Sequence, residues 1–170
     1  MQTTTGARYA WRSAALVCVL VAAAGCGGNG TPVRDAQAVT DEVATQSDAV
    51  LTMTQVKGKV SGSGATEVSC NYDNDDDPNR EMLNMWSLHG LDNTVLGKAM
   101  ANLAAGLPEK GWKVVKNGPD RSMSRSQEIQ AVHLATKTQL DATWQKNLQR
   151  GDPMIVFHVY SRCFRKPSDN

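Results

Sequence analysis

The N-terminal 26 residues constrain this chain most, because they decide the compartment and the redox state in which the rest of it folds. Arg8 and Arg12 precede an uninterrupted apolar run from Ala14 to Ala24, and no acidic residue occurs before it. This layout is typical of a secretory signal peptide, and the run is too short for a membrane-spanning helix, which needs about 20 apolar residues. The sequence therefore predicts export, with residues 1–25 removed as a signal peptide.

The end of the apolar run indicates a lipid anchor. Ala23-Ala24-Gly25-Cys26 places small residues before a cysteine and resembles the bacterial lipobox, in which the thiol receives a diacylglyceryl group and the chain is cut before that cysteine. We expect Cys26 to be lipidated and residues 26–34 to form a polar, glycine-rich tether. The predicted location is the extracytoplasmic face of the cell membrane. The alternative is ordinary cleavage nearby, with Cys26 left as a free thiol.

The remaining cysteines then become simple to assign. Cys18 leaves with the signal peptide and Cys26 carries lipid, so Cys70 and Cys163 remain in an exported domain. Two such thiols are expected to pair in an oxidising compartment. Each falls on the apolar parity of its predicted strand, so we expect the disulfide to form in the core. The alternative is two buried free thiols.

Length and composition bound the class of protein. The chain has 170 residues, 41% of them apolar, and a formal net charge of +1. This is enough for one modest core, and the charge excludes a strongly basic nucleic-acid binder, so no nucleic-acid partner is expected. We predict a single domain over residues 35–166 and a disordered tail over residues 167–170.

Hydrophobic periodicity predicts the elements of this domain. Helices are expected over residues 35–53 and from a cap at 92–94 to Pro108, and strands over residues 65–72, 81–89, 112–116, 130–145 and 154–164. A glycine-rich break is expected at 57–64, a turn at 117–120 and an exposed loop at 121–126. The fold class is therefore α+β: an antiparallel sheet of about five strands with two amphipathic helices packed on one face.

One segment allows two structures. Residues 130–145 alternate with period 2 and are rich in threonine, which favours a strand broken near residues 137–139. Leu140, Trp144 and Leu148 are also spaced as in a helix, so residues 139–150 could be strand or helix, of which we favour the strand.

These elements and their short motifs resemble the actinobacterial LppA-type lipoproteins, a family of small lipid-anchored envelope proteins. The likeness lies in Asp75-Asp-Asp-Pro-Asn79 after the first strand, in the helix that ends before Gly111-Trp112, and in Cys163-Phe164 at the end of the last strand. The resemblance implies a compact α+β domain and implies no reaction.

An acidic turn is the strongest candidate for a cation site. Asp73, Asp75, Asp77 and Asn79 imitate the first four ligand positions of a calcium loop. The loop then fails, because Pro78 takes the place of the required glycine and no glutamate occupies the twelfth position. We therefore predict a solvated acidic turn and no metal site, with a weak cation site as the alternative.

The other candidate residues favour structural roles. His89, His133 and His158 lack metal-type spacing, and the last two are expected on a solvated sheet face. Arg150-Gly-Asp152 spells an adhesive tripeptide but also suits a hairpin turn, which we predict. Trp86, Trp112 and Trp144 are expected in the core.

No common nucleophile, phosphate-binding, dinucleotide or zinc motif is present, and no cofactor is expected. The leading functional hypothesis is a non-enzymatic binding module that presents a surface to another envelope protein or to a small apolar ligand. The alternative is a cell-wall or lipid-modifying hydrolase or transferase with its acids drawn from residues 73–77 and Glu81.

Overall fold

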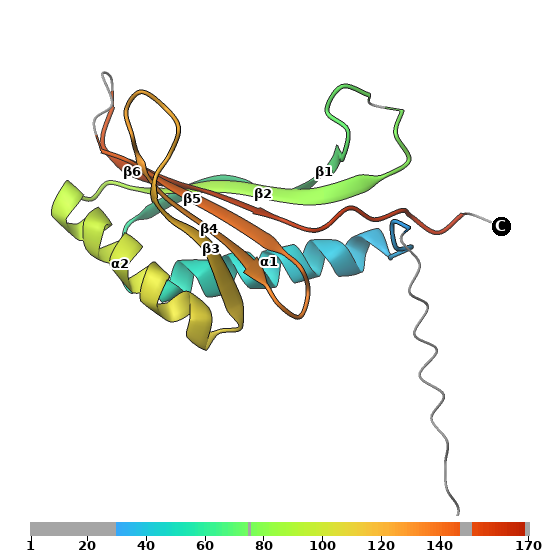
Figure 1. Ribbon diagram of the computed structural model, residues 1–170, viewed down its shortest axis with the longest axis horizontal. Coiled ribbons are helices and arrows are strands. Elements are labelled where there is room, and N and C mark those ends of the chain that lie inside the picture. The colour runs from blue at the N-terminus through green and yellow to red at the C-terminus, as the bar shows by residue number, and fades with distance from the viewer. Residues whose placement is uncertain (1–29, 75, 147–150, 169–170) are drawn as a thin grey trace, which may run out of the picture.

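One antiparallel sheet of six strands and two helices make up the described part of the chain, residues 30–74, 76–146 and 151–168 of a computed structural model (Figure 1). In chain order the elements are α1 (Ala36–Met53), β1 (Lys59–Ser69), β2 (Arg80–His89), α2 (Asn93–Glu109), β3 (Trp112–Pro119), β4 (Gln127–His133), β5 (Gln139–Gln145) and β6 (Met154–Tyr160). The predicted α+β class is confirmed, with six strands where the sequence predicts about five.

Both helices begin at an aspartate that caps them. The Asp35 carboxylate accepts a hydrogen bond from the amide of Ala38 at 2.8 Å, and Asp92 accepts one from the amide of Val95 at 2.9 Å. These caps satisfy amides that lack a partner in the first helical turn. Gly111 follows the end of α2 with a φ of +80°, a conformation that glycine tolerates best. Both predicted helices are confirmed.

The strand order places the last strand of the chain at the centre of the sheet. The order is β1-β2-β6-β5-β4-β3, and every neighbouring pair is antiparallel. β1 and β2 form one hairpin, β3 to β6 form a meander, and α2 connects the two units (Figure 1). Strands β1 and β3 are therefore the edges of the sheet.

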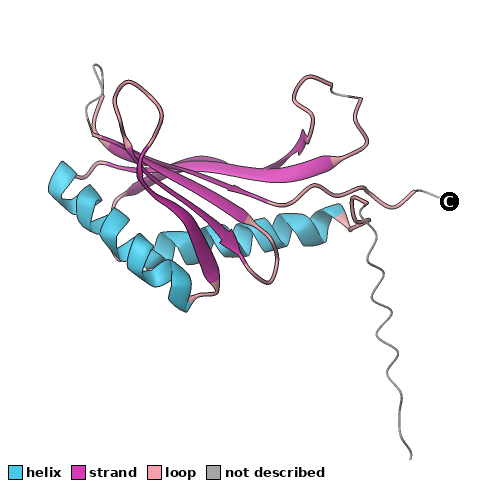
Figure 2. Cartoon of the chain, viewed as in Figure 1, coloured by secondary structure: helices cyan, strands magenta, loops and turns pink. Residues whose placement is uncertain are grey.

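Both helices cover the same face of the sheet, as predicted (Figure 2). The core lies between this face and the helices, where alternate strand residues meet the apolar stripes of α1 and α2. Trp86 stacks on Phe157 with ring centroids 3.9 Å apart, and Trp112 is also buried. Trp144 is half-buried and packs against the core. The predicted core positions are thus confirmed for Trp86 and Trp112, whereas Trp144 lies at the margin of the core.

The edge strands begin and end differently from the sequence prediction. The first helix ends before the glycine-rich segment 57–64, as predicted, but the first strand starts earlier than the predicted residue 65, because β1 begins at Lys59 and pairs with β2 through this segment. Pairing with a neighbour provides hydrogen bonds that local composition does not encode, and a bulge between Gly62 and Ala65 absorbs the irregularity. The turn predicted at 117–120 lies later in the chain, because β3 extends to Pro119. A proline is tolerated there because β3 is an edge strand.

The alternation predicted for residues 130–145 is wrong in its first part. It places His133 on the solvated face, but the buried apolar residues of β4 are Ile129 and Ala131, which share the parity of His133. His133 is therefore on the helix-covered side, where its half-buried ring contacts Trp112 at a centroid distance of 5.2 Å. The turn between β4 and β5 resets the alternation, so one phase cannot be extended across it.

The strand is confirmed for the described part of residues 139–150, because β5 covers Gln139–Gln145. Residues 147–150 lie outside the described residues, as do the predicted signal peptide, Cys26 and residues 169–170 of the predicted tail.

The segment before α1 lies against the C-terminal segment. Val33 and Arg165 form a parallel bridge, in which the Arg34 amide donates to the Arg165 carbonyl at 2.9 Å and the Arg165 amide donates to the Pro32 carbonyl at 2.8 Å. The Arg34 guanidinium also pairs with Glu42 of α1 at 2.7 Å. The end of the predicted tether is thus attached to the domain beside the residues that follow β6.

Candidate functional site

The face of the sheet opposite the helices, which we call the open face, has no covering layer in the part of the chain that the structure describes. Strand alternation and register place these central side chains on it: Leu83, Met85, Glu128, Gln130, Asp141, Thr143, Val156, His158 and Tyr160. The β1–β2 loop and the β3–β4 loop rise on this side of the sheet (Figure 1). The open face therefore lies between these two loops.

A hollow of about 320 Å³ lies on the open face and is lined by Tyr72, Leu83, Asp141, His158 and Tyr160. We call it the tyrosine hollow. Sheet register forms it, because Leu83 of β2 lies opposite Tyr160 of β6, and His158 of β6 lies opposite Asp141 of β5. Tyr72 comes from the β1–β2 loop and is 73% exposed. Four polar side chains and one aliphatic side chain thus meet in a solvent-accessible site.

Asp141 is the acidic group of this hollow. Burial raises the pKa of Asp141 above its usual range, and the nearby Glu128 carboxylate raises it further. Both of its oxygens are engaged, because Gln130 donates to Oδ2 at 3.2 Å and Thr143 donates to Oδ1 at 3.2 Å. Among the described ion pairs none joins Asp141 to a cation. Its negative charge is therefore poorly compensated by the protein.

The negative charge of Glu128 is compensated by a neighbouring cation, unlike that of Asp141. It is only 8% exposed, and burial by itself favours its neutral form. The hydrogen bond and ion pair with Lys116 of β3, together with contributions from Asp141 and Gln130, outweigh burial and lower the pKa of Glu128. Lys116 is therefore already engaged by a carboxylate on the same face.

The two tyrosines of the hollow remain neutral over the physiological range. The hydroxyl of Tyr72 donates to Glu81 Oε1 at 2.6 Å, and this bond is the main cause that raises the pKa of Tyr72 to about 12. Burial raises the pKa of Tyr160, with further contributions from the charges of Asp141 and Glu81. Both phenols thus present a hydroxyl and an uncharged ring.

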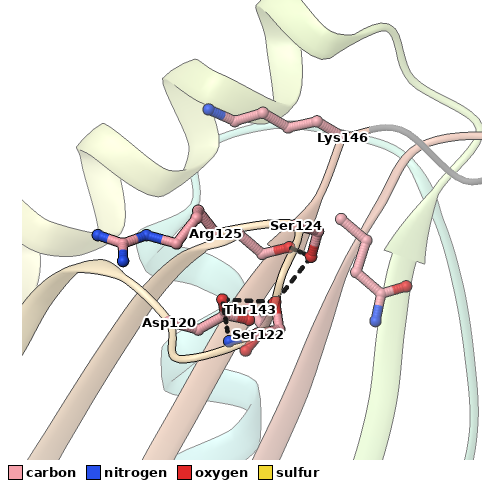
Figure 3. A pocket seen from close by; sticks show the side chains of 8 residues that line it. Asp120, Ser122, Ser124, Arg125, Thr143 and Lys146 are labelled. Atoms are coloured by element: carbon pink, nitrogen blue, oxygen red, sulfur yellow. Dashed lines mark hydrogen bonds between the residues drawn. The ribbon is translucent and has the colours of Figure 1, made fainter.

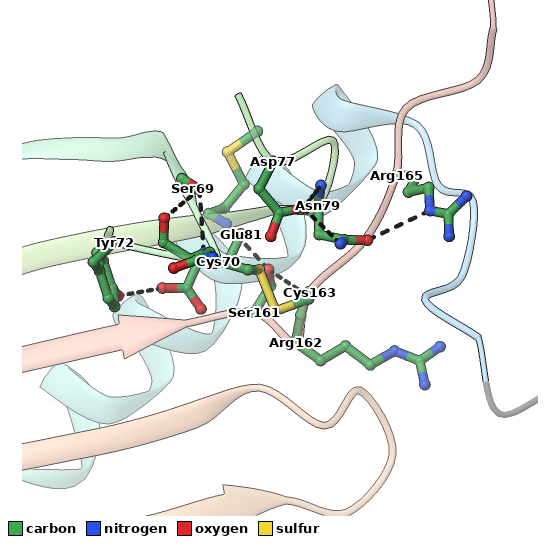
Figure 4. The surroundings of a disulfide bond; sticks show 12 residues. Ser69, Cys70, Tyr72, Asp77, Asn79, Glu81, Ser161, Arg162, Cys163 and Arg165 are labelled. Atoms are coloured by element: carbon green, nitrogen blue, oxygen red, sulfur yellow. Dashed lines mark hydrogen bonds between the residues drawn. A yellow bond between two sulfur atoms is a disulfide. The ribbon is translucent and has the colours of Figure 1, made fainter. Parts of the chain in front are cut away.

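The disulfide lies beside this site (Figure 4). Cys70 and Cys163 are joined, with Cα atoms 6.1 Å apart, which confirms the predicted pair. The predicted core position is wrong, because both residues are half-buried next to Glu81. The strand prediction extends the alternation of β6 too far: β6 ends at Tyr160, and Phe164 takes the buried position instead.

Because Cys70 lies two residues before Tyr72, the disulfide ties the loop that carries this wall of the hollow to the C-terminal segment. The disulfide also engages the two sulfur atoms that could otherwise act as metal ligands at this position. Among the described residues, Cys70, Glu81 and Cys163 are the one group of three that could hold an ion, and its two sulfurs are bonded to each other.

A second hollow, of about 340 Å³, lies toward the β3–β4 loop (Figure 3). It is lined by Asp120, Ser122, Ser124, Arg125, Ser126, Thr143, Gln145 and Lys146. The hydroxyl of Ser122 donates to Asp120 at 2.7 Å, and a further hydrogen bond joins it to Ser124. The bond from Ser122 is the main cause that lowers the pKa of Asp120. The polar groups of this loop therefore mainly satisfy one another.

The acidic turn does not gather its described side chains into a cation site. The Asp77 carboxylate accepts hydrogen bonds from the amide and the side chain of Asn79, at 2.8 and 2.7 Å. Asp73 is exposed to solvent, and Asp75 lies outside the described residues. These bonds within the turn are those of a side-chain-capped loop.

The structure separates the other predicted candidates. His89 bonds with Ser61 at 2.6 Å, and His133 bonds with Thr136 at 2.8 Å. His158 lies on the open face, as predicted, and is the one histidine that lines the tyrosine hollow. The tripeptide at 150–152 begins at Arg150, which lies outside the described residues.

Sequence reasoning missed Asp141 and Tyr160 as site residues. Both occupy the polar parity of a strand whose other parity is apolar, so they look like ordinary solvated residues. An aspartate at the centre of a strand is unusual enough to have drawn notice, because aspartate is depleted in strands.

Comparisons with known proteins add no assignment: the chain matches no protein-family model, no curated protein and no solved structure with significance. Among the described residues, no helix has the length and apolar character needed to cross a membrane. The resemblance to the LppA-type lipoproteins therefore stays a prediction.

Proposed function

We propose that this protein is a non-enzymatic binding module, lipid-anchored on the extracytoplasmic face of the cell membrane, and that the open face is its binding surface. The observation that carries the proposal is the tyrosine hollow, where Asp141, His158 and two phenols face solvent on an otherwise well-packed domain. Pockets that combine aromatic walls with a few polar groups are the default binding sites of a fold. The partner is an envelope protein or a small ligand.

Anchoring rests on the small residues before Cys26 and on the length of the tether. Cys26 lies six positions before Pro32 in the sequence, and the carbonyl of Pro32 accepts a hydrogen bond from the C-terminal segment. An extended chain spans at most about 3.5 Å per residue, so the lipid would lie within about 20 Å of the domain. The end of the sheet near the disulfide would therefore lie close to the bilayer.

Fractionation tests the anchor. The parent is expected in the membrane fraction at the mature, lipidated mass, and Cys26→Ser is expected to remain uncleaved or to be secreted without lipid. One acyl chain binds membranes only marginally, so stable attachment requires the multi-acyl modification. Membrane retention of Cys26→Ser at the mature mass would contradict the lipobox assignment.

Site-specific cross-linking tests the binding surface. A photoreactive amino acid at Met85, which is 55% exposed on the open face, is expected to form defined adducts in intact cells. The same group at Ala101, on the exposed side of α2, is the matched control. Equal adducts from both positions, or adducts from Ala101 alone, would refute the open face as the binding surface.

The geometry supports a binding module over the hydrolase alternative. That alternative needs two carboxylates from residues 73–81 and a histidine in a deep pocket. In the described chain, Glu81 is hydrogen bonded to Tyr72, and the hollow that contains His158 is open and takes its carboxylate from β5. Release of soluble products from cell-wall or lipid substrates that disappears in Glu81→Gln would favour the hydrolase.

A further inference from the structure

We propose that the tyrosine hollow binds the ammonium group of a lysine side chain on a partner protein. The inference rests on the proposed function, since it names the chemistry that the open face recognises. Three properties of the hollow carry it: an excess of negative charge, walls suited to a lysine stem, and an acidic group whose oxygens are already partly engaged.

The charge around the hollow favours a cation. Asp141 lines it, and Glu81 is hydrogen bonded to the tyrosine that forms one wall. Among the described residues, neither carboxylate takes part in an ion pair, whereas Lys116 on the same face is paired with Glu128. A cation in the hollow would therefore meet uncompensated negative charge without displacing an existing pair.

The walls match the two parts of a lysine side chain. Leu83 offers an apolar surface for the methylene stem, and the exposed ring of Tyr72 can face a cation. Tyr160 contributes a second neutral phenol, whose oxygen can accept a hydrogen bond from an ammonium group. A volume of about 320 Å³ is large enough for this side chain.

The hydrogen bonds of Asp141 favour an ammonium over a guanidinium. Each of its oxygens already accepts one bond, from Gln130 and from Thr143. A guanidinium binds a carboxylate best as a planar fork that engages both oxygens at once, whereas an ammonium is a compact charge that needs a single free direction. A metal ion is less suited, because the hollow supplies one carboxylate and one histidine.

Methionine-methyl NMR on the mature lipidated protein in non-ionic detergent can measure this binding. Met85 is the reporter because it lies opposite His158 on the open face, and the buried Met100 of α2 is the internal reference. The probe is Nα-acetyl-lysine N-methylamide, and the matched neutral probe is its norleucine analogue. We expect the lysine probe to shift the Met85 signal with a dissociation constant on the order of 1 mM, and the norleucine probe to bind at least tenfold more weakly.

Two variants locate the effect. Asp141→Asn keeps the size of the side chain and is expected to weaken lysine binding at least tenfold. Asp48→Asn removes an exposed acid from α1, on the other side of the sheet, and is expected to leave it unchanged. Tyr72→Leu removes one ring and should weaken binding several-fold, so the inference does not depend on the folding of a single variant.

The outcomes separate this inference from the proposed function. Equal binding of the lysine and norleucine probes, or equal losses in Asp141→Asn and Asp48→Asn, would overturn the ammonium assignment. Equal affinity for the arginine analogue would overturn the preference for an ammonium group over a guanidinium group. Equal affinity for butylamine would overturn the assignment to a lysine of a partner protein and indicate free amines as the ligand. Any of these results together with adducts from Met85 would leave the binding module standing with another ligand.

Discussion

Removal of the disulfide is the change whose cost can be derived most directly from the structure. Cys70 and Cys163 close a loop over a sequence separation of 93 residues. In the chain-entropy model, a crosslink of this span removes enough freedom from the unfolded chain to contribute about 4–5 kcal/mol to the free energy of unfolding at 25 °C. We therefore expect Cys70→Ser with Cys163→Ser to lower the stability by about 4 kcal/mol.

The native fold is expected to survive this double substitution. The backbone pairs Arg80 with Phe164, whose side chain is fully buried, and Ser161 exchanges hydrogen bonds with Met82. These contacts hold the C-terminal segment beside β2 without the crosslink. The loss should therefore arise mainly in the unfolded state, which becomes less constrained.

Urea unfolding followed by tryptophan fluorescence gives the measurement, since Trp86 and Trp112 are both buried. With an m-value of about 2 kcal/mol/M, the midpoint should fall by about 2 M. Cys163→Ser alone should form mixed disulfides that the double variant cannot form, because its remaining Cys70 thiol can react with other exported chains. A double variant that loses less than about 1 kcal/mol with an unchanged fold would refute the entropic argument.

Individual contacts support three more predictions. Asp141→Asn should raise the melting temperature at pH 7, because the raised folded-state pKa of Asp141 means that its negative charge opposes folding. This gain in melting temperature should disappear as the pH falls through that pKa, since Asp141 of the parent then becomes protonated. Gly62→Ala should lower the free energy of unfolding in urea by about 1–3 kcal/mol, because the added Cβ would lie 2.9 Å from a backbone oxygen of β2. Gly118 has open space around it, so Gly118→Ala should change the free energy of unfolding by less than about 0.5 kcal/mol. Millimolar calcium should not raise the melting temperature of the parent, and Asp75→Asn with Asp77→Asn should change it little; a calcium-dependent rise that this double variant loses would identify a cation site.

The helices were predictable because their information is local. The apolar spacing of α1 and α2 and the caps at Asp35 and Asp92 occur within each segment, so no knowledge of the partner surface is needed. The faces of the strands are different. A single-residue shift in phase moves a side chain to the other side of the sheet, and the sequence does not mark where the phase changes.

His133 and Cys163 illustrate this limit. Each lies beyond a point where the alternation is interrupted, by the turn after β4 for His133 and by the end of β6 for Cys163. Extending one parity through such a point assigns His133 to the wrong face and Cys163 to the core, where it does not lie. The pairing of Cys70 with Cys163 was still predictable, because it depends on the compartment and on the number of remaining thiols, and not on the face.

The tyrosine hollow required one more kind of information, which is the register between strands. Asp141 and His158 belong to β5 and β6, which are successive in the chain, and they face each other because the intervening hairpin sets Gln145 opposite Met154. Tyr160 then meets Leu83 only because the central position of β6 brings it beside β2. Local periodicity identifies each of these residues as polar or apolar, but the site is a property of the strand order β2-β6-β5. The chemistry of the open face thus depends on the placement of β6 between β5, its neighbour in the chain, and β2, which is distant in sequence. A substitution that displaced β6 would remove the hollow even if every residue lining it were retained.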